Sequence, residues 1–437
     1  MLTASSGTVM AKRLTGNLPE DKFDPNIAQS ANVAGTFSLE EIVDASAVEY
    51  SDQWQSTCVN CGEGDLPQQD FVDGDVVNPF QFGILGNWRP KRSYKFLTDR
   101  EYTANTRDDG YYEDAGGLVT ANDMRFLWED PASAAQRSEW TFAEQVTKYS
   151  PYGYEVENQD AVGRYSAAVY GYNNSLVTAV GANMRYQEMA YDGFEDYVAF
   201  LACDDNHFRL DAAQQTGLSM LYAHSGRYSY QVPNGQALVY NKPVIDEQAC
   251  AEALSGGKKP RSLDGLGNTQ DGTDYVLSNC DCLGKFAPSS SKRYVVNLWV
   301  RAETENFTYT GIEANINFTG SPVTFTFEPR GKVIEGWQRI YGEFEIPAGA
   351  TGISVDVSNE TLENVYIDDV RLHPFLGNMK SYVFNPVNLK MEAELDANNY
   401  ATFYIYDAEG KLTLIKKETR EGIRTIQENR GSTQRND

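Results

Sequence analysis

At 437 residues, the chain is long enough for two to four domains with sizeable hydrophobic cores. Its net charge of −25 and isoelectric point of about 4.5 make nucleic acid and anionic membrane surfaces poor partners. No run of eighteen apolar residues occurs, so no transmembrane helix is predicted. The 27 tyrosines and the aromatic content of 12% favour a β-rich secreted protein over a helical cytosolic enzyme.

The amino-terminal residues 1–48 are mixed and polar, and we expect them to form an extension. Residues 1–8 lack a basic start and an apolar run, so they do not form a signal peptide. Either the protein is cytosolic, or the chain is the carboxyl-terminal part of a longer secreted or cell-surface protein that is exported through an upstream signal. We favour the second. Ser38, followed by Glu40 and Glu41, predicts the start of a helix.

Residues 49–190 are predicted to form β-hairpins that end in a helix. Trp140–Tyr149 alternates apolar and polar residues as a half-buried strand does, and Tyr-Gly pairs separate the short strand-like runs after it. Over residues 175–191 the spacing becomes helical, because apolar residues recur every four positions from Leu176. We expect this helix to seal the hairpins and to lead into the next domain.

Residues 191–374 are predicted to form a two-sheet β-sandwich. Three runs within it alternate apolar and polar side chains, so each is apolar on one face only. Strands of this kind bury their apolar faces by stacking in two sheets. Clusters of Gly and Pro separate the runs, as turns do. The three runs are residues 294–301, 312–318 and 338–346.

Residues 375–427 contain a sequence repeat. The stretch 381–389 parallels the stretch 403–412 at an offset of 22 residues. The turn sequence Asp-Ala-Glu-Gly at residues 407–410 places glycine where a positive φ costs little. We expect hairpins here, followed by a disordered polar tail over residues 428–437.

Several motifs resemble known families. Four short motifs are similar, in this order, to those of jelly-roll carbohydrate-binding modules found beside bacterial glycosidases: Gly-Phe-Glu-Asp (193–196), Ser-Gly-Arg-Tyr-Ser (225–229), Gly-Trp (336–337) and Ile-Asp-Asp-Val (367–370). The repeat within residues 381–412 resembles the YD repeat of the Rhs family, whose repeats build large β-sheet shells or run along secreted surface proteins. The end-to-end order is similar to that of long Bacteroidetes surface proteins. These resemblances imply a mainly β chain, in which YD-repeat-like hairpins (49–190 and 375–427) flank a jelly-roll sandwich (191–374), with few short helices.

The jelly-roll resemblance implies a structural calcium ion held by Glu195 and Asp368, where the opening strand meets the final one. Asp368 shares strand parity with the apolar residues that follow it, so its carboxylate is expected to point inward. An inward carboxylate without a partner costs several kcal/mol, so a cation, or else Arg227 or Lys292, must compensate. The alternative is a capped or solvent-reached aspartate. Asp369 has the opposite parity and is expected at the surface.

Outward-facing aromatic, amide and guanidinium side chains of the sandwich strands are the candidate glycan-binding residues. A flat ring beside hydrogen-bonding groups is what stacking on a pyranose requires. The alternative is that Trp299 and Trp337 pack under loops or against a neighbouring domain. The candidates are Asn297, Trp299, Arg301, Trp337, Arg339 and Tyr341.

The six cysteines form an even set. A C-x-x-C and a C-x-C pair match a tetrahedral zinc site poorly, and no thioredoxin-like pattern surrounds the C-x-x-C pair. Disulfide bonds formed in an oxidising compartment are therefore favoured over a metal site, with the pairing left open. The candidates are Cys58, Cys61, Cys203, Cys250, Cys280 and Cys282.

The sequence holds three histidines and no Gly-x-Ser-x-Gly, His-Glu-x-x-His or phosphate-loop motif. A glycosidase carboxylate pair stays open, because 62 acidic residues make chance pairs common. We predict a non-enzymatic segment of a larger Rhs-like chain whose jelly roll binds glycan or cell-surface polysaccharide, or mediates adhesion. The alternatives are a structural spacer in an Rhs-type protein and a glycan-active hydrolase.

Overall fold

Antiparallel β-strands dominate the part of the chain that the computed structural model describes, and the helices there are two short 3₁₀ helices. The chain is therefore mainly β, as predicted. No helix in this part of the chain is long and apolar enough to cross a bilayer. The described residues are 3–13, 40–51, 89–96, 99–101, 111–114, 117–118, 140–150, 153–197, 207–211, 213–246, 262–263, 269–270, 286–306 and 308–429.

The chain divides into two compact units. Unit 1 comprises Met1–Trp54, Asn78–Thr147 and Asn158–Gly163, and unit 2 comprises Gln55–Val77, Lys148–Glu157 and Arg164–Asp437. In unit 1, strands β1, β2, β3 and β7 pair in that order, while β4, β5 and β6 form a small sheet. The bounds are β1(Thr3–Arg13), β2(Glu40–Ser51), β3(Arg89–Phe96), β4(Asp99–Glu101), β5(Tyr111–Asp114), β6(Gly117–Leu118) and β7(Trp140–Tyr149).

The helix predicted to begin at Ser38 is wrong where the structure describes it. Glu40 and Glu41 open β2, which pairs with β1 and, further along, with β3. Ser38 itself lies outside the described residues. Cross-strand pairing satisfies the backbone N–H and C=O groups of β2, so it overrides the local signal for a helix start.

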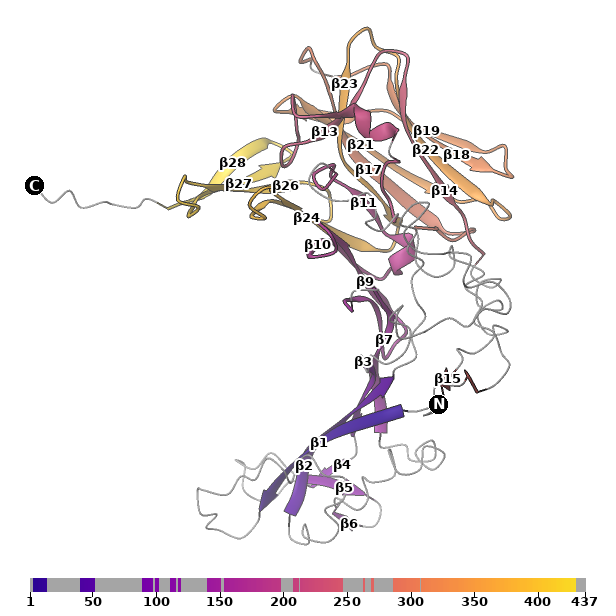
Figure 1. Ribbon diagram of the computed structural model, residues 1–437, viewed down its shortest axis with the longest axis vertical. Coiled ribbons are helices and arrows are strands. Elements are labelled where there is room, and N and C mark those ends of the chain that lie inside the picture. The colour runs from indigo at the N-terminus through magenta and orange to yellow at the C-terminus, as the bar shows by residue number, and fades with distance from the viewer. Residues whose placement is uncertain are drawn as a thin grey trace, which may run out of the picture. The chain divides into compact units, whose positions relative to one another are not determined.

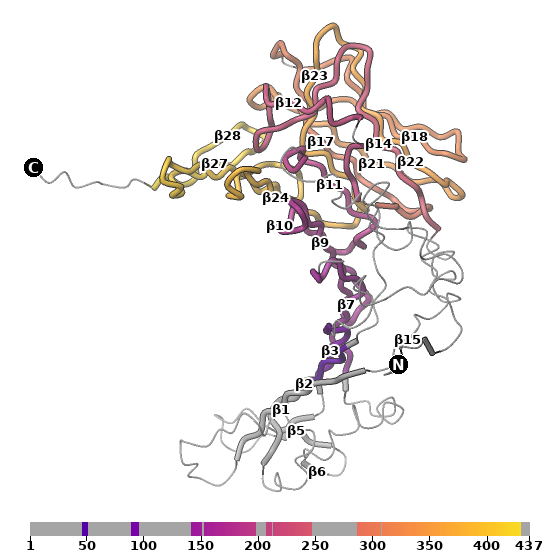
Figure 2. The backbone as a smooth tube through the Cα atoms, in the orientation of Figure 1, coloured from indigo at the N-terminus to yellow at the C-terminus, as the bar shows by residue number. Residues whose placement is uncertain are grey.

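One sheet of unit 2 is an antiparallel meander in which the sandwich is inserted (Figure 1). β10 pairs with β9, and its other edge pairs with β24 through Ala179 opposite Ser381. Segments on either side of residues 191–374 therefore complete one sheet. From β24 the chain continues strand by strand to β28 (Figure 2). The bounds are β9(Tyr165–Gly171), β10(Leu176–Ala182), β24(Asn378–Phe384), β25(Met391–Leu395), β26(Ala401–Tyr406), β27(Leu412–Thr419) and β28(Gly422–Glu428).

The helix predicted over residues 175–191 is wrong. These residues form β10, the 3₁₀ helix η2(Tyr186–Glu188) and β11(Ala190–Asp192). Both edges of β10 are paired, and one of its two partners, β24, lies about two hundred residues further along the chain. A partner so distant leaves no local signal, so the four-residue spacing of apolar side chains was misleading.

Three successive turns of the meander begin with a side-chain carbonyl or carboxylate at intervals of 11 residues. The Oδ1 atoms of Asn385, Asp396 and Asp407 accept backbone N–H groups two residues further on, at 2.9, 2.8 and 3.0 Å. These Asx turns connect β24 to β25, β25 to β26 and β26 to β27. The hairpins predicted from the 22-residue offset are confirmed, and that offset equals two of these intervals.

The remaining strands of unit 2 include two facing sheets, which confirm the predicted two-sheet sandwich. One sheet has the order β12-β13-β23-β17-β21-β20, with β11 also beside β23, and the other has the order β14-β22-β18-β19. Their common core contains Leu298, Ile316, Val355 and Ile367. The bounds are β12(Leu218–Ser219), β13(Ser229–Val232), β14(Ala237–Pro243), β17(Arg293–Ala302), β18(Ile312–Thr319), β19(Thr324–Phe327), β20(Arg330–Ile334), β21(Trp337–Glu345), β22(Gly352–Asn359) and β23(Val365–Pro374).

The two central strands β17 and β23 are buried on both faces. One face packs in the sandwich core, and the other lies against the turn between β25 and β26. There the indole Nε1 of Trp299 donates to the carbonyl of Asn399 at 2.7 Å, and Arg371 donates to the carbonyl of Asp396 at 2.6 Å. The meander therefore covers the outer face of the sandwich, which fixes the position of the candidate site.

Candidate functional site

A β-bulge in β23 reverses the predicted direction of its acidic side chains. Arg371 lies opposite Asn297 and Asp368 lies opposite Trp299, so two residues of β23 face one residue of β17. Asp369 adopts a φ of +50° at this point. Because of the bulge, Asp368 points away from the sandwich core instead of into it, and Asp369 is buried instead of exposed. The expected burial of Asp368, with its need for compensation, is confirmed, whereas its direction and the expected surface position of Asp369 are wrong.

A buried polar cluster forms around the bulge. The carboxylate of Asp369 accepts His224 Nδ1 at 2.7 Å, the Ser225 hydroxyl at 2.8 Å and the Tyr191 hydroxyl at 2.9 Å. His224 Nε2 lies 3.1 Å from Glu418 Oε1, on β27. His224 therefore bridges one carboxylate of the sandwich and one of the meander, and we name these five residues, with Asp368, the His224 cluster.

The protonation of His224 follows from its two carboxylate neighbours. Burial by itself lowers the pKa of this imidazole, but Glu418 and Asp369 outweigh burial and raise the pKa to about 10. Burial and the neighbouring Asp369 hold the pKa of Asp368 well above its usual value, while His224 and its backbone N–H oppose that rise. At neutral pH the cluster thus contains an imidazolium between two acids.

The Ser225, His224 and Asp369 side chains do not form a nucleophilic triad. The hydroxyl of Ser225 donates to Asp369 and not to the imidazole, so His224 is not placed to act as the base of a Ser-His-Asp triad. All three residues are buried. The cluster is therefore a structural connection, and sequence analysis missed it because Glu418 lies 194 residues from His224.

Glu195 and Asp368, the predicted calcium ligands, contact the same short segment, since Asp368 accepts the backbone N–H of His224 and Glu195 accepts that of Arg227. The Oε1 atom of Glu195 accepts the backbone N–H groups of Arg227 and Tyr228 at 2.5 and 2.6 Å, and both oxygens of Asp368 accept backbone N–H groups, that of His224 among them. Among the described residues, no three His, Cys, Asp or Glu side chains are grouped as metal ligands. The donor set therefore fits calcium poorly, and calcium stays a prediction.

The side chains expected to neutralise Asp368 have other partners. Lys292 pairs with Glu188 at 3.1 Å, and Arg227 lies 3.5 Å from Glu392. Backbone N–H groups and His224 compensate Asp368 instead. The second oxygen of Glu195 is buried without a hydrogen-bond partner in the described part of the chain, and burial raises the pKa of Glu195 to about 8.

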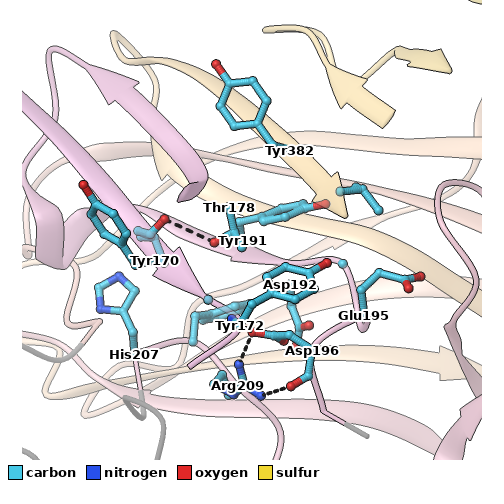
Figure 3. Close-up of a pocket in the computed structure, with 15 residues that line it drawn as sticks. Tyr170, Tyr172, Thr178, Tyr191, Asp192, Glu195, Asp196, His207, Arg209 and Tyr382 are labelled. Carbon is cyan, nitrogen blue, oxygen red and sulfur yellow. Dashed lines mark hydrogen bonds and ion pairs between the residues drawn. The ribbon is translucent and has the colours of Figure 1, made fainter. Parts of the chain in front are cut away.

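Beside Glu195 lies a small cavity of about 40 Å³ between the sandwich and the meander of unit 2 (Figure 3). Arg209 is bonded to Asp196 at 2.5 Å there, and Glu195 points away from that pair. A volume of this size holds only a few water molecules, because one water needs roughly 10–15 Å³ on the same measure. This cavity is therefore too small for a sugar.

A much larger groove of about 850 Å³ lies between the sandwich and the last strands of the meander. Phe403, Lys416 and Thr425 share one face of the meander, because they are cross-strand neighbours in β26, β27 and β28. The sandwich contributes the opposite wall. We name this space the meander groove, and its walls include Tyr222, His224, Arg227, Arg301, Trp337, Asn388, Lys390, Phe403, Lys416, Glu418 and Thr425.

Three of the six predicted glycan-binding residues are buried. Trp299 is 1% exposed, Asn297 2% and Trp337 3%, so none presents a free ring face or amide to a sugar, and Trp337 borders the meander groove only with the little surface that it exposes. The imidazole of His224 stacks on the Trp299 indole at 4.3 Å and meets Trp337 edge-on at 5.7 Å. The alternative, that these two tryptophans pack under other parts of the chain, describes them correctly.

The other three predicted residues occupy two places. Arg301 lines the meander groove, where its guanidinium lies 4.2 Å from the centre of the Tyr222 ring. Arg339 donates to the carbonyl of Asn398 at 2.7 Å, and Tyr341 beside it is 41% exposed outside the groove. The six predicted disulfide candidates, Cys58, Cys61, Cys203, Cys250, Cys280 and Cys282, all lie outside the described residues.

A scan against protein-family models finds no match, and no curated protein matches the sequence. Among solved structures, "Family 16 Carbohydrate Binding Module-2" is 8% identical over 36% of this chain and 82% of that chain, with a TM-score of 0.20. The C-terminal family 22 carbohydrate-binding module of Clostridium thermocellum Xyn10B is 13% identical over 36% of this chain and 78% of that chain, also with a TM-score of 0.20. TmCBM61, solved in complex with β-1,4-galactotriose, is 14% identical over 43% of this chain and 90% of that chain, with a TM-score of 0.17. These low values assign neither a family nor a function, and the Rhs, YD-repeat and Bacteroidetes resemblances stay predictions.

Proposed function

We propose that the chain binds a glycan in the meander groove and has no catalytic role of its own. The observation that carries the proposal is the groove itself. Its volume of about 850 Å³ lies in the range of roughly 300–1,000 Å³ that is typical of small-molecule sites. A short stretch of a polysaccharide chain is a suitable occupant for a groove of this volume.

The chemistry of the walls supports a polar, ring-shaped ligand. Tyr222 and Phe403 offer partly exposed aromatic surface, and Arg227 and Lys416 offer hydrogen-bond donors. The ammonium group of Lys416 has no hydrogen bond or ion pair within the described part of the chain, so it is available to a ligand. Aromatic surface beside such donors is what recognition of sugar hydroxyl or carboxylate groups requires.

The His224 cluster supports the proposal by fixing the two walls of the groove. His224 and Glu418 line the groove, and their contact joins the sandwich wall to the meander wall. A preformed site binds with less loss of conformational entropy than one that must be ordered by its ligand. Membership of a longer secreted or surface protein, in which such binding mediates adhesion, is part of this proposal and is supported by the acidic, tyrosine-rich composition.

The test is retardation of the full chain in native gels that contain neutral or uronate-rich polysaccharides, followed by calorimetry with fragments of any that retard it. We expect Tyr222→Ala to weaken binding by roughly two- to tenfold, because one aromatic contact is worth about 0.5–1.5 kcal/mol. Lys416→Gln should weaken binding to the uronate-rich polymers more than to the neutral ones.

The matched control is Tyr341→Ala, which removes an exposed aromatic ring outside the groove. It should leave retardation unchanged. Weakening by Tyr341→Ala alone would move the site to the Arg339 and Tyr341 surface. The absence of retardation across the whole panel would leave the spacer role, and turnover of a glycan would support the hydrolase.

A further inference from the structure

A lysine, a glutamine and a glutamate meet in a buried part of unit 2, away from the meander groove. Lys148 Nζ lies 2.9 Å from Gln187 Oε1, and it is also 4.0 Å from Glu157 Oε2. The Lys148 side chain is 12% exposed and the Glu157 side chain 3%, and Gln187 is 3% exposed as a residue. An amine, a carboxamide and a carboxylate thus share a site that is largely closed to water.

Short contacts hold the glutamine in place. Gln187 belongs to the 3₁₀ helix η2, and its backbone carbonyl accepts the N–H of Ala287 at 2.8 Å. The preceding residue, Tyr186, donates its backbone N–H to Glu157 at 2.8 Å. The electrophile and the carboxylate are therefore fixed relative to each other, while the lysine approaches from the end of β7. Positioning of this kind raises the rate of reaction between two bound groups.

The environment also favours a neutral amine. Burial lowers the pKa of Lys148, and Arg185 lowers it further, whereas Glu157 and Glu188 oppose the shift. A lysine with a lowered pKa provides more of the uncharged form, which is the nucleophile. In the folded unit the site thus contains a nucleophile, an acyl group and a proton acceptor.

We propose that Lys148 and Gln187 react to form an intramolecular isopeptide bond. A bond forms between Lys148 Nζ and Gln187 Cδ, and the bond between Cδ and Nε2 breaks. The Nε2 group leaves as ammonia and carries away the proton that Nζ loses, so atoms and electrons balance without an oxidant or another reagent. Glu157 receives that proton and returns it to the leaving group, directly after a small rotation or through one water.

The cross-link would join Lys148, at the end of β7, to Gln187 in η2, and both residues belong to unit 2. It would close a loop from residue 148 to residue 187, which includes β8(Glu155–Asp160), β9 and β10. The covalent loop would thus contain β10, which is one of the two strands in the β10–β24 pair that completes the meander. The proposal is independent of glycan binding, since none of the three residues lines the meander groove.

Mass spectrometry of the intact, fully reduced and denatured chain tests the proposal. The folded chain should be lighter than its sequence by one ammonia, and protease digestion should yield one branched peptide that joins Lys148 to Gln187. Deamidation would increase the mass, and a succinimide would lose ammonia without producing a branched peptide, so neither imitates this result. Soluble, folded protein with the full mass would overturn the proposal.

Three variants assign the roles. Lys148→Arg and Glu157→Gln should both restore the full mass, the second because a glutamine keeps the shape and can accept the Tyr186 N–H without receiving a proton. The matched control is Lys292→Arg, at a lysine that is 3.1 Å from a carboxylate instead of a carboxamide; it should still lose ammonia. A cross-link that persists in Glu157→Gln would remove Glu157 from the reaction, and a branched peptide at another pair of residues would overturn the assignment.

Discussion

His224 joins the sandwich to the meander through two buried carboxylates. Its replacement by alanine leaves Asp369 and Glu418 buried without their shared cation. The loss of one partner of a buried charge pair typically costs about 3–5 kcal/mol. We therefore expect His224→Ala to lower the free energy of unfolding of unit 2 by that amount, measured by urea denaturation.

The comparison variant is Lys332→Ala, which removes an ion pair of 3.1 Å with Glu421 whose side chains are both 66% exposed. Such pairs contribute about 0–1 kcal/mol. Equal effects of the two replacements would show that the imidazolium in the His224 cluster carries no special share of the stability.

Glu195 is the residue at which the predicted calcium ion can be tested. One of its oxygens already accepts two backbone N–H groups, and the other is buried and unpartnered among the described residues. Because no group of three acidic, histidine or cysteine ligands surrounds it there, we expect EDTA to leave the urea midpoint unchanged. A lower midpoint in EDTA that added calcium restores, and that Glu195→Gln abolishes, would establish the ion.

At the scale of elements, the turn before β13 must approach the meander closely. Gly226 has a φ of +67°, and a Cβ atom there would lie 2.4 Å from Glu195 Oε1 and 2.8 Å from Val383 on β24. Gly235 has a φ of +69° with nothing within 4 Å of its Cβ position. Gly235→Ala should therefore cost only the left-handed strain of about 1–2 kcal/mol.

Gly226→Ala carries the same strain and a steric conflict as well. Because such overpacking costs roughly 1–3 kcal/mol, we expect this variant to be less stable than Gly235→Ala by that amount in urea denaturation. If the two alanine variants were equally stable, the turn would have room to move away from β24, and the close packing of sandwich on meander would not hold.

The elements that the sequence predicts well are those with a signal in their own residues, such as an alternating apolar pattern or a turn motif. β18 alternates buried and partly exposed residues as its sequence alternates apolar and polar ones, and the turn at Asp407 carries its own Asx and glycine signals. β23 escaped correct prediction because every residue from Val365 to His373 is buried and a bulge breaks its parity. The candidate site was missed for a related reason, since its walls come from segments far apart in the sequence.

For unit 2 as a whole, the order of assembly follows from the insertion. β10 completes its pairing only when β24 has been made and brought back, after the entire sandwich. Pairing over such a distance carries a loop-closure cost that an already folded sandwich reduces, because its two ends then lie close together. The His224 cluster, which joins the sandwich to the meander through Glu418, thus reports on the last stage of assembly.

Glu195 and His224 both make the stability of unit 2 fall as the pH rises. On folding, the pKa of Glu195 rises from 4.5 to about 8, and the pKa of His224 rises from 6.5 to about 10. Both values are raised, so the folded state holds more protons than the unfolded state, and the stabilisation is lost as pH rises through these windows. Burial lowers the pKa of His373 from 6.5 to about 4, so its effect on stability has the opposite sign and is confined to pH values below 6.5.

The two windows overlap between pH 6.5 and 8, where we expect the steepest loss of stability, of order 1.4 kcal/mol per pH unit for each group. Urea denaturation at half-unit steps of pH measures it. Glu195→Gln should flatten the profile below pH 6.5, reduce the slope between pH 6.5 and 8, and leave the loss between pH 8 and 10, whereas His224→Ala should remove that upper part. A stability that rises with pH across this interval would mean that the two carboxylate contacts do not hold His224 protonated, and that the sandwich and the meander are joined by other forces.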